Sequence, residues 1–250
     1  MRPRIAIPLP HSLDPEYGQR AYPQYAAAVE KAGAEALQIP LNQAPAEVMK
    51  LIERCDAVLL PGSKADVDPA KYGAERHPRT AAADPSRDTV DELLLQDAYN
   101  MRKPILAICY GLQVLNVYRT GTLLQHIESA INHAAGRQAA VAHTVEVDPG
   151  SKLASIVSSA ASGNTPMPVN SSHHQSAEVA GDGLRVVARC PADGIIEALE
   201  GTAPDHFVLA VQWHPERMFG EDEPSRALFR ALVEAAQSWR KNLAGEFESV

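Results

Sequence analysis

Short apolar runs alternate with segments of helical periodicity in the first half of the chain. The runs at 5–7, 36–39, 57–60 and 105–108 are predicted to be strands, and the last is wholly apolar, as expected of a strand buried on both faces. Strands that alternate with helices in the order βαβαβαβ predict a parallel sheet with right-handed crossovers.

The helices between these runs are marked by apolar spacing and by end signals. Apolar residues recur at helical spacing over 22–32, with Gly33 as the C-cap, and a short helix is predicted over 46–54. Asp84 and Pro85 supply an N-cap and a first-turn proline for a third helix. Its buried face is predicted to hold Val90, Leu93, Leu94, Ala98 and Met101.

The second half of the chain is richer in strand signals. Strands are predicted over 141–147, 184–188, 195–199 and 208–212, with a turn at 181–183. A final helix begins near Glu223. The residues predicted on its buried face are Leu228, Ala231, Leu232, Ala235 and Trp239. The 158–165 segment is predicted to be a surface loop, so that residues 1–250 form one α/β domain.

The composition narrows the class of partner. The 250 residues carry 23 Lys and Arg against 31 Asp and Glu, a net charge of −8, without a basic run of the kind that binds nucleic acid. No apolar stretch approaches the ~20 residues needed to span a bilayer, and the N-terminus lacks a signal-peptide pattern. Three cysteines are too few for a disulfide framework, and Cys55 and Cys190 are interpreted as core thiols. We therefore expect a cytoplasmic protein with no nucleic-acid or membrane partner.

Cys109 is a candidate nucleophile, in the segment Ala107-Ile108-Cys109-Tyr110-Gly111 between the apolar 105–108 strand and a helix that begins near Leu112. A nucleophile on such a sharp turn is held at the carboxyl edge of the sheet. The helix N-terminus behind it favours the thiolate, and the N–H of Tyr110 would point at a developing oxyanion. Taken alone, the pattern fits a buried structural cysteine equally well.

His214 and Glu216 follow the 208–212 strand, in Gln212-Trp213-His214-Pro215-Glu216. Pro215 favours an extended backbone at His214, and side chains at i and i+2 of an extended chain lie on the same side. His214 would then be a base oriented by the Glu216 carboxylate. A lone histidine is more often a satisfied core residue, but together with the Cys109 turn the pair indicates a catalytic triad.

The Cys109 turn, the 211–216 segment and the Pro61-Gly62 loop together resemble the class I glutamine amidotransferase family, within its gamma-glutamyl hydrolase branch. The segments that match the branch are Asp66-Val67-Asp68-Pro69, Tyr72-Gly73, Arg87-Asp88, Leu115-Asn116-Val117, Asn170-Ser171-Ser172-His173-His174-Gln175, Asp193-Gly194 and Glu197-Ala198. They follow the family's order over nearly the whole chain. The resemblance implies a flavodoxin-like three-layer sandwich, whose mostly parallel central sheet carries extra antiparallel strands in the C-terminal half.

The resemblance also assigns roles to residues of the proposed reaction centre. It implies Cys109 as the nucleophile, His214 as general base and acid, and Glu216 as the third member of the triad. The oxyanion donors would be the backbone N–H groups of Tyr110 and of Gly62 or Ser63.

Substrate-binding residues are assigned in the same way. Gln113, in the pattern Cys-x-Gly-x-Gln, matches a position that contacts the glutamyl group, and one of His173 and His174 is expected to line the site. The implied reaction is hydrolysis of a gamma-glutamyl amide through a gamma-glutamyl thioester, with release of glutamate. Gamma-glutamyl-gamma-aminobutyrate, other gamma-glutamyl amines and gamma-glutamyl peptides are candidate substrates, and polyamine catabolism is the implied context.

Three positions depart from the family's pattern. The loop Pro61-Gly62-Ser63-Lys64-Ala65 lacks the second glycine of the usual Pro-Gly-Gly, so its oxyanion donor is not fixed by the resemblance. Thr120-Gly121-Thr122 replaces Gly-Gly-Thr, and His126 replaces the usual Asp. Neither of these two changes touches the triad.

No cofactor or metal is expected. Asp66 and Asp68 are candidate ligands, but Asp68-Pro69 is favoured as an N-cap with a first-turn proline. His173 and His174 are adjacent and therefore point apart on an extended chain, and no Cys-x-x-Cys or His-Glu-x-x-His pattern accompanies them.

Two other functions fit the same residues. A glutaminase subunit that passes ammonia to a synthetase partner would use the same triad, and a gamma-glutamyl-binding protein without turnover would keep the same fold. The sequence specifies neither the leaving amine nor the oligomeric state. A homodimer is expected only because dimers are the commonest oligomers of soluble proteins. Specificity is expected to come from the 61–84 loop and the 158–176 region.

Overall fold

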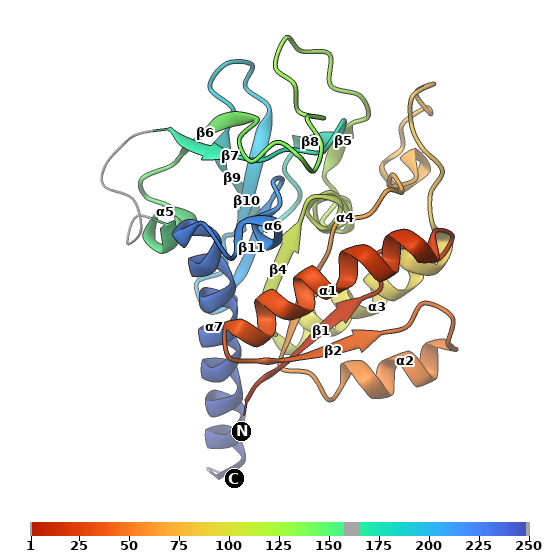
Figure 1. Cartoon of the computed structure of the whole chain (residues 1–250). Helices are drawn as coiled ribbons and strands as arrows, with labels where there is room; N and C mark the ends of the chain where they lie inside the picture. The colour runs from red at the N-terminus through yellow and green to blue at the C-terminus, as the bar shows by residue number, and fades with distance from the viewer. Residues whose placement is uncertain (1, 158–165, 249–250) are drawn as a thin grey trace.

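A nine-stranded sheet runs through the molecule in the strand order β2-β1-β3-β4-β11-β10-β9-β6-β7 (Figure 1). The computed structural model describes residues 2–157 and 166–248, so the segment predicted as a surface loop, 158–165, lies outside the described residues. The strands are β1 (Arg4–Pro8), β2 (Glu35–Ile39), β3 (Ala57–Leu60), β4 (Ile105–Ile108), β5 (Thr122–Leu124), β6 (His143–Val147), β7 (Met167–Val169), β8 (Ser176–Val179), β9 (Leu184–Arg189), β10 (Ile196–Gly201) and β11 (Val208–Val211). The helices are α1 (Pro15–Lys31), α2 (Pro45–Ile52), the 3-10 helix η1 (Pro69–Tyr72), α3 (Pro85–Met101), α4 (Tyr110–Tyr118), α5 (Lys152–Val157), α6 (Pro215–Met218) and α7 (Glu223–Glu248).

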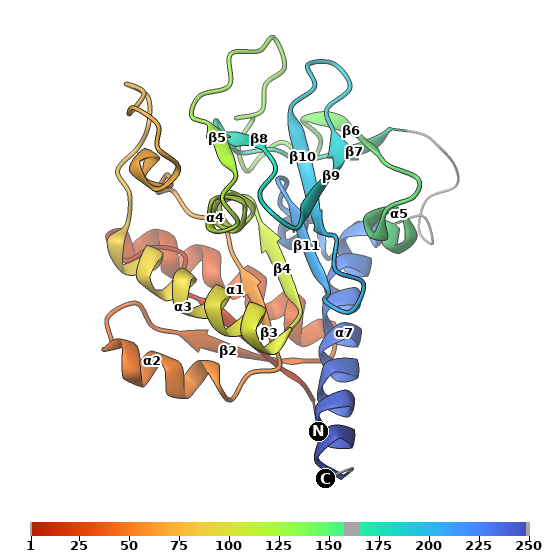
Figure 2. The same cartoon turned by 180° about the vertical axis from the view of Figure 1, so that it is seen from behind.

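The strands β2, β1, β3, β4 and β11 are parallel neighbours, as the alternation of strands and helices predicts. Their side chains alternate between two cores: on β3, Val58 and Leu60 face one core, and Ala57 and Leu59 face the other. Helices α2, α3 and α4 contribute to the first core and α1, α5 and α7 to the second, on opposite faces of the sheet (Figures 1 and 2). The predicted three-layer α/β fold is therefore confirmed.

The strands β10, β9, β6 and β7 extend the sheet in antiparallel fashion, as predicted for the C-terminal half. Strand β6 begins at His143 rather than at residue 141, and the Val141 side chain is 59% exposed. Five elements were not predicted, namely β5, β7, β8, α5 and α6. They are three to six residues long, too short for apolar periodicity to mark them.

Helix α3 begins as predicted, but its last turn differs from the prediction. The Asp84 side chain accepts a hydrogen bond from the N–H of Arg87, which is the expected N-cap. Met101, predicted to be buried, is 45% exposed, because the helix ends there at Arg102, whose φ is +53°. The apolar spacing of a last turn therefore does not ensure that its residue reaches the core.

The buried face of α7 overlaps the predicted face without matching it. Leu228 and Leu232 are buried as predicted, whereas the other three predicted residues are only half-buried. Phe229, Val233 and Ala236 occupy the core instead. The helix is thus rotated slightly about its axis relative to the predicted orientation.

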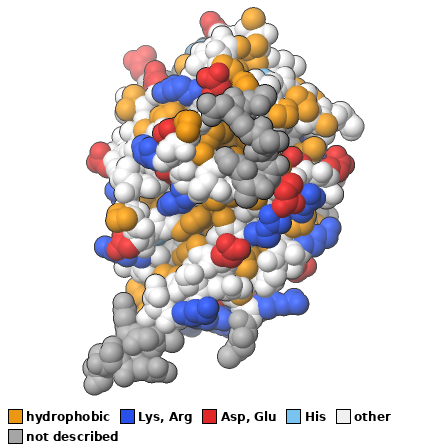
Figure 3. Space-filling model, turned by 90° about the vertical axis from the view of Figure 1, so that its left-hand side faces the viewer, with side chains coloured by type: hydrophobic (Ala, Val, Ile, Leu, Met, Phe, Trp, Pro, Cys, Tyr) orange, Lys and Arg blue, Asp and Glu red, His pale blue; other side chains and the backbone are white. Residues whose placement is uncertain are grey.

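None of the helices among the described residues is long and apolar enough to cross a bilayer. On the face that carries α5 and α7, basic and acidic side chains lie interspersed (Figure 3). Cys55, Cys109 and Cys190 are all buried free thiols.

Position 120, between α4 and β5, tests one departure from the family's pattern. Thr120 has a φ of +68°, a conformation that costs a β-branched residue roughly 1–2 kcal/mol and that glycine adopts readily. We expect Thr120→Gly to raise the free energy of unfolding by about 0.5–1 kcal/mol, since glycine's greater entropy in the unfolded chain offsets part of the gain.

Gly121→Ala is the matched comparison for this change. A Cβ at position 121 would lie 2.5 Å from the side-chain amide of Asn116, so this variant should lose about 1–3 kcal/mol. Urea unfolding of both variants measures the difference, and a Thr120→Gly protein less stable than wild type would contradict the strain argument.

Candidate active site

Cys109 stands at the turn between β4 and α4, with φ +55° and ψ −108°. The turn is held by the Cys109 N–H, which donates to the Val211 carbonyl at 2.8 Å. It closes tightly, because a Cβ on Gly111 would lie 2.3 Å from the Leu60 carbonyl oxygen, so only glycine fits there. The structure thus places the predicted nucleophile on a strained strand-to-helix turn at the carboxyl edge of the parallel sheet.

His214 follows β11, the parallel neighbour of β4, and so lies at the same edge of the sheet. The Asn170 side chain clamps its backbone: the His214 N–H donates to Asn170 Oδ1, and Asn170 Nδ2 donates to the His214 carbonyl, both at 2.9 Å. This pair of hydrogen bonds fixes the histidine backbone independently of its side-chain partners.

The Glu216 carboxylate lies beside the His214 ring, with Oε1 2.8 Å from Nδ1. The sequence predicts this contact from an extended chain, in which residues 214 and 216 lie on the same side. That geometry is wrong, because α6 begins at Pro215 and Glu216 belongs to its first turn. The His214 ring and the Cys109 side chain both lie against Gly62, since a Cβ at position 62 would be 3.0 Å from His214 Cε1 and 3.6 Å from Cys109 Cβ. Cys109, His214 and Glu216 are therefore gathered in one place, and all three are buried.

The charges of these groups support one another. Burial opposes protonation of His214, but the Glu216 carboxylate and the Cys109 side chain outweigh it and raise the pKa of His214 to about 9. Burial likewise opposes ionisation of Glu216, yet the facing imidazolium lowers the pKa of that carboxyl. The arrangement therefore favours a protonated imidazole beside the Glu216 carboxylate.

Two backbone N–H groups near Cys109 have no partner among the described residues. The N–H of Tyr110 belongs to the first residue of α4, where no carbonyl precedes it in the helix, and the N–H of Ser63 makes none of the loop's hydrogen bonds. The Gly62 N–H instead donates to the Tyr25 hydroxyl at 3.1 Å. Gly62 lies against the centre, since a Cβ there would be 3.0 Å from His214 Cε1 and 3.6 Å from Cys109 Cβ.

Gln113, on α4, is buried one turn after the nucleophile and joins two other glutamines. Its Nε2 donates to the Gln175 carbonyl at 3.2 Å and contacts Gln212 Oε1 at 3.3 Å. Gln175 Oε1 and Gln212 Nε2 are buried with no hydrogen-bond partner among the described residues. Gln175 therefore leaves a buried acceptor, and Gln212 a buried donor, without partners next to Gln113 of α4.

The adjacent histidines at 173 and 174 diverge, as expected for neighbours on an extended chain. His174 Nε2 lies 3.1 Å from Asp66 Oδ1, whereas His173 is buried, with its Nδ1 2.9 Å from the Gln175 carbonyl. Asp68 accepts a hydrogen bond from the Ala70 N–H at the start of η1, so the N-cap interpretation is confirmed.

Arg87 supports this edge of the sheet in a way that the sequence analysis did not anticipate. Its fully buried guanidinium pairs with Asp91 at 2.8 Å and donates to the carbonyls of Pro10 and Pro61, both at 2.9 Å. The guanidinium also lies over the Tyr110 ring, 5.1 Å from its centroid. One side chain thus joins the loops after β1 and β3 to the residue that follows the nucleophile.

Asp88, the next residue along α3, holds Tyr110 from its other end. The Tyr110 hydroxyl donates to Asp88 Oδ1 at 3.0 Å. The Arg87-Asp88 segment, noted in the sequence only as a family match, therefore fixes the tyrosine whose N–H faces the candidate centre.

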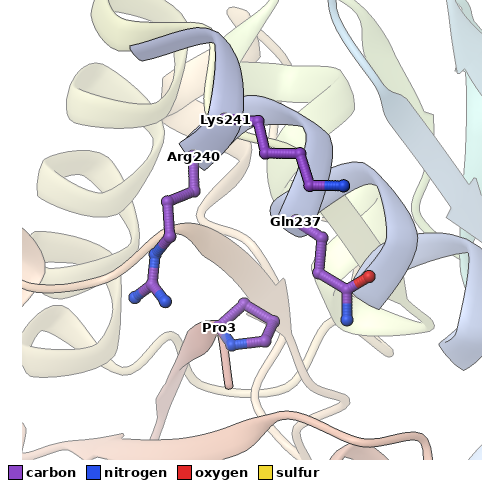
Figure 4. A pocket seen from close by; sticks show the side chains of 4 residues that line it. All are labelled: Pro3, Gln237, Arg240 and Lys241. Carbon is purple, nitrogen blue, oxygen red and sulfur yellow. The ribbon is translucent and has the colours of Figure 1, made fainter. Parts of the chain in front are cut away.

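A separate groove lies at the opposite end of the strands, next to the start of β1. It has a volume of about 580 Å³ and is lined by Pro3, Gln237, Arg240 and Lys241 (Figure 4). Arg240 is engaged by Asp56 at 2.7 Å. The groove carries no nucleophile or general base, so the candidate centre is the carboxyl edge.

The chain matches the model of a known protein family and is similar to several named proteins. The model of the family described as peptidase C26 matches residues 11–216. A Mycobacterium tuberculosis protein named "Putative glutamine amidotransferase" is 37% identical over 219 residues, covering 86% of this chain and 67% of that protein. The Escherichia coli K12 protein named gamma-glutamyl-gamma-aminobutyrate hydrolase is 35% identical over 226 residues, covering 86% and 85%.

A solved structure is similar over its whole length. The crystal structure of a Thermoplasma acidophilum protein described as a "putative gmp synthase subunit a" superposes with a TM-score of 0.68 at 13% identity, covering 98% of both chains. At that identity the likeness concerns the fold alone.

Replacing Arg87 is expected to be severely destabilising. Burial raises the pKa of Asp91 to about 6 even with the guanidinium beside it. Without Arg87, the buried Asp91 carboxylate would have no cation to compensate its charge, which destabilises the fold. We expect Arg87→Met to lower the free energy of unfolding by about 3–5 kcal/mol, and the double change Arg87→Met with Asp91→Leu to recover part of the loss. Urea unfolding measures both.

Arg54→Met, at an exposed arginine, is the control and should change stability by less than ~0.5 kcal/mol. Equal stability of Arg87→Met and Arg54→Met would show that the buried guanidinium does not organise this edge.

Proposed function

Since the chain belongs to the peptidase C26 family, we propose that it hydrolyses a gamma-glutamyl amide with Cys109 as nucleophile, His214 as general acid and base, and Glu216 as the group that orients His214. The observation that carries this proposal is the buried 2.8 Å contact between His214 and Glu216, with the His214 ring and Cys109 both against Gly62 at the carboxyl edge of the sheet. Membership of the family supports hydrolysis; the assignment of these three residues rests on their geometry.

In the first step, the Cys109 sulfur attacks the gamma carbonyl carbon and forms a C–S bond. The negative charge that develops on the carbonyl oxygen is received by the N–H groups of Tyr110 and Ser63, the two unpartnered donors beside the nucleophile. A donor in such a position contributes roughly 2.7–4 kcal/mol to the transition state. The C–N bond then breaks, and His214 gives its proton to the departing amine.

In the second step, water replaces the amine. Neutral His214 removes a proton from that water, which attacks the thioester carbonyl, and the C–S bond breaks to release glutamate and the Cys109 thiolate. The 2.8 Å contact with Glu216 keeps Nδ1 as the protonated nitrogen, so Nε2 exchanges the proton in both steps. The same histidine therefore serves as acid and then as base.

We assign recognition of the glutamyl group to buried polar atoms that have no hydrogen-bond partner among the described residues. Gln113 holds Gln175 and Gln212, whose free acceptor and donor suit the ammonium and carboxylate of a glutamyl group. Arg217 adds a cation: its Nε is 3.5 Å from Glu216 Oε1 and is buried without a hydrogen-bond partner among the described residues. The first substrate to test is gamma-glutamyl-gamma-aminobutyrate, which the name of the Escherichia coli relative specifies.

The substrate class is tested by glutamate release from gamma-glutamyl-gamma-aminobutyrate, other gamma-glutamyl amines, short gamma-glutamyl peptides and free glutamine. We expect preference for a substituted gamma-glutamyl amide, and Cys109→Ala should lower kcat by at least about 10³-fold while leaving substrate binding in place. Cys55→Ala, at a buried thiol away from the turn, is the matched control and should retain activity.

Cleavage of glutamine alone would favour the glutaminase alternative and contradict a stand-alone hydrolase. Full activity of Cys109→Ala would rule out the nucleophile. Binding of gamma-glutamyl compounds without any release would leave the protein as a binding protein.

The proposed role of His214 predicts an alkaline limit to activity. Because the pKa of His214 is about 9, kcat/KM should fall as pH rises through that value, when the acid that protonates the leaving amine is lost. Glu216→Gln should move this fall to lower pH, since the neutral amide no longer favours the imidazolium, and should lower kcat by about 10²–10⁴-fold.

The exposed Glu53→Gln serves as the control for the pH profile.

The free energy of unfolding should also depend on the protonation of His214. The pKa of His214 in the fold lies above its ordinary value of 6.5, so its contribution is fully present below pH 6.5 and is lost as pH rises through about 9. An alkaline limit identical in wild type and Glu216→Gln would refute the proposed coupling.

A further inference from the structure

Three histidines and a glutamate form a second polar cluster, distinct from the triad. His133 lies in the loop before β6, His143 is the first residue of β6, His173 follows the Asn170 clamp, and Glu197 lies on β10. All four residues are buried. They come from four separate segments of the chain, so no local sequence pattern announces them.

Four ligand-type atoms converge at the centre of this cluster. Glu197 Oε1 lies 3.2 Å from His133 Nδ1, 3.4 Å from His143 Nε2 and 3.5 Å from His173 Nε2. All four atoms lie within 4.8 Å of one another. Among the described residues none of them has a partner in acceptable hydrogen-bond geometry, and neither has Glu197 Oε2. Buried polar atoms are rarely left without hydrogen-bond partners, and several such atoms at one point are rarer still.

The outer nitrogen of each ring is held by an acceptor. His133 Nε2 lies 2.8 Å from Asp193 Oδ2, His143 Nδ1 3.2 Å from the Thr144 carbonyl, and His173 Nδ1 2.9 Å from the Gln175 carbonyl. A carbonyl or carboxylate oxygen only accepts, so the outer nitrogens carry the hydrogens. A ring in its neutral form therefore directs the lone pair of its inner nitrogen at the Glu197 carboxylate.

Lone pairs that face a carboxylate in a buried site repel unless a cation lies between them. We propose that His133, His143, His173 and Glu197 bind a divalent transition-metal cation, and that this cation is Zn²⁺. Zinc takes imidazole and carboxylate ligands at about 2.0–2.1 Å in a tetrahedron, for which neighbouring ligand atoms are about 3.3 Å apart. The three measured separations from Glu197 Oε1 bracket that edge.

The ligand set and its surroundings indicate a structural rather than a catalytic metal. Four protein ligands complete the tetrahedron, so no position is left for water or substrate. Each imidazole has an acceptor on its far nitrogen, the arrangement that fixes ring orientation at zinc sites. The expectation of no metal considered His173 only with its neighbour His174, and it missed His133, His143 and Glu197 because folding alone brings them together.

The metal would position the segment that carries the Asn170 clamp. The His133 carbonyl accepts hydrogen bonds from the His173 N–H at 3.0 Å and from the Ser171 hydroxyl, which ties the two loops beside the cluster. Asn170 in turn holds the His214 backbone, and Gln175 holds Gln113. A cation at the cluster would tie the 170–175 segment, at His173, to His143 of β6 and Glu197 of β10.

The test is the metal content of the full-length, tag-free protein purified without chelators. We expect about one zinc ion per chain by elemental analysis. Chelation should lower Tm, and added Zn²⁺ should restore it. Replacement by Co²⁺ should give the intense visible absorption of a tetrahedral site, a readout that needs no variant.

Variants then locate the ion. His143→Ala and Glu197→Gln should each retain less than about a tenth of the wild-type zinc. His206→Gln, at a buried histidine that bonds the Lys103 carbonyl at 2.8 Å, is the matched control and should keep it. Cys190→Ser should keep it as well, although Cys190, Asp193 and the outer nitrogen of His133 form a second group of ligand type.

Two results would overturn the proposal. One is wild-type protein without metal whose Tm does not respond to Zn²⁺ and which shows no tetrahedral Co²⁺ spectrum. The other is zinc that survives in His143→Ala and Glu197→Gln but is lost in Cys190→Ser, which would place the ion on the outer group. Neither result depends on catalytic activity.

Discussion

The buried guanidinium of Arg87 is the contact on which the carboxyl edge of the sheet depends. The loops after β1 and β3 and helix α3 meet where the parallel strands end, and their polar groups need partners out of reach of water. Arg87 supplies these from one planar group: it binds Asp91 on its own helix, the Pro10 and Pro61 carbonyls, and the face of Tyr110. The carboxyl edge of the sheet is therefore stabilised by a guanidinium group that is fully buried and whose nitrogens all have partners.

The candidate site lies at the seam between two kinds of sheet. The parallel strands β4 and β11 bring Cys109 and His214 to the same edge, while the segment that clamps His214 belongs to the antiparallel half. The Cys109 backbone is thus fixed by local turn geometry, and the His214 backbone by hydrogen bonds from a distant part of the chain. Changes far from Cys109 in sequence are therefore expected to alter the geometry of the candidate centre.

What the sequence could predict follows the same division. The strands buried on both faces, the Cys109 turn and the Asp84 cap are written in contiguous residues, and the structure contains each of them. The short elements β5, β7, β8 and α5 depend on pairing with partners, so composition does not mark them. Asp91 and the histidine cluster were missed for a related reason, because their importance arises from groups that only tertiary structure brings within reach. The Glu216 contact was anticipated, but for an extended backbone that the structure replaces with the first turn of α6.

The positive φ of Cys109 sets the stability of the turn against the presence of a thiol at that position. A side chain in that conformation costs roughly 1–3 kcal/mol, which glycine would not incur. A glycine at position 109 would keep the turn without that cost, and such a chain would have no thiol. The stability of the fold alone therefore does not account for a cysteine at this turn.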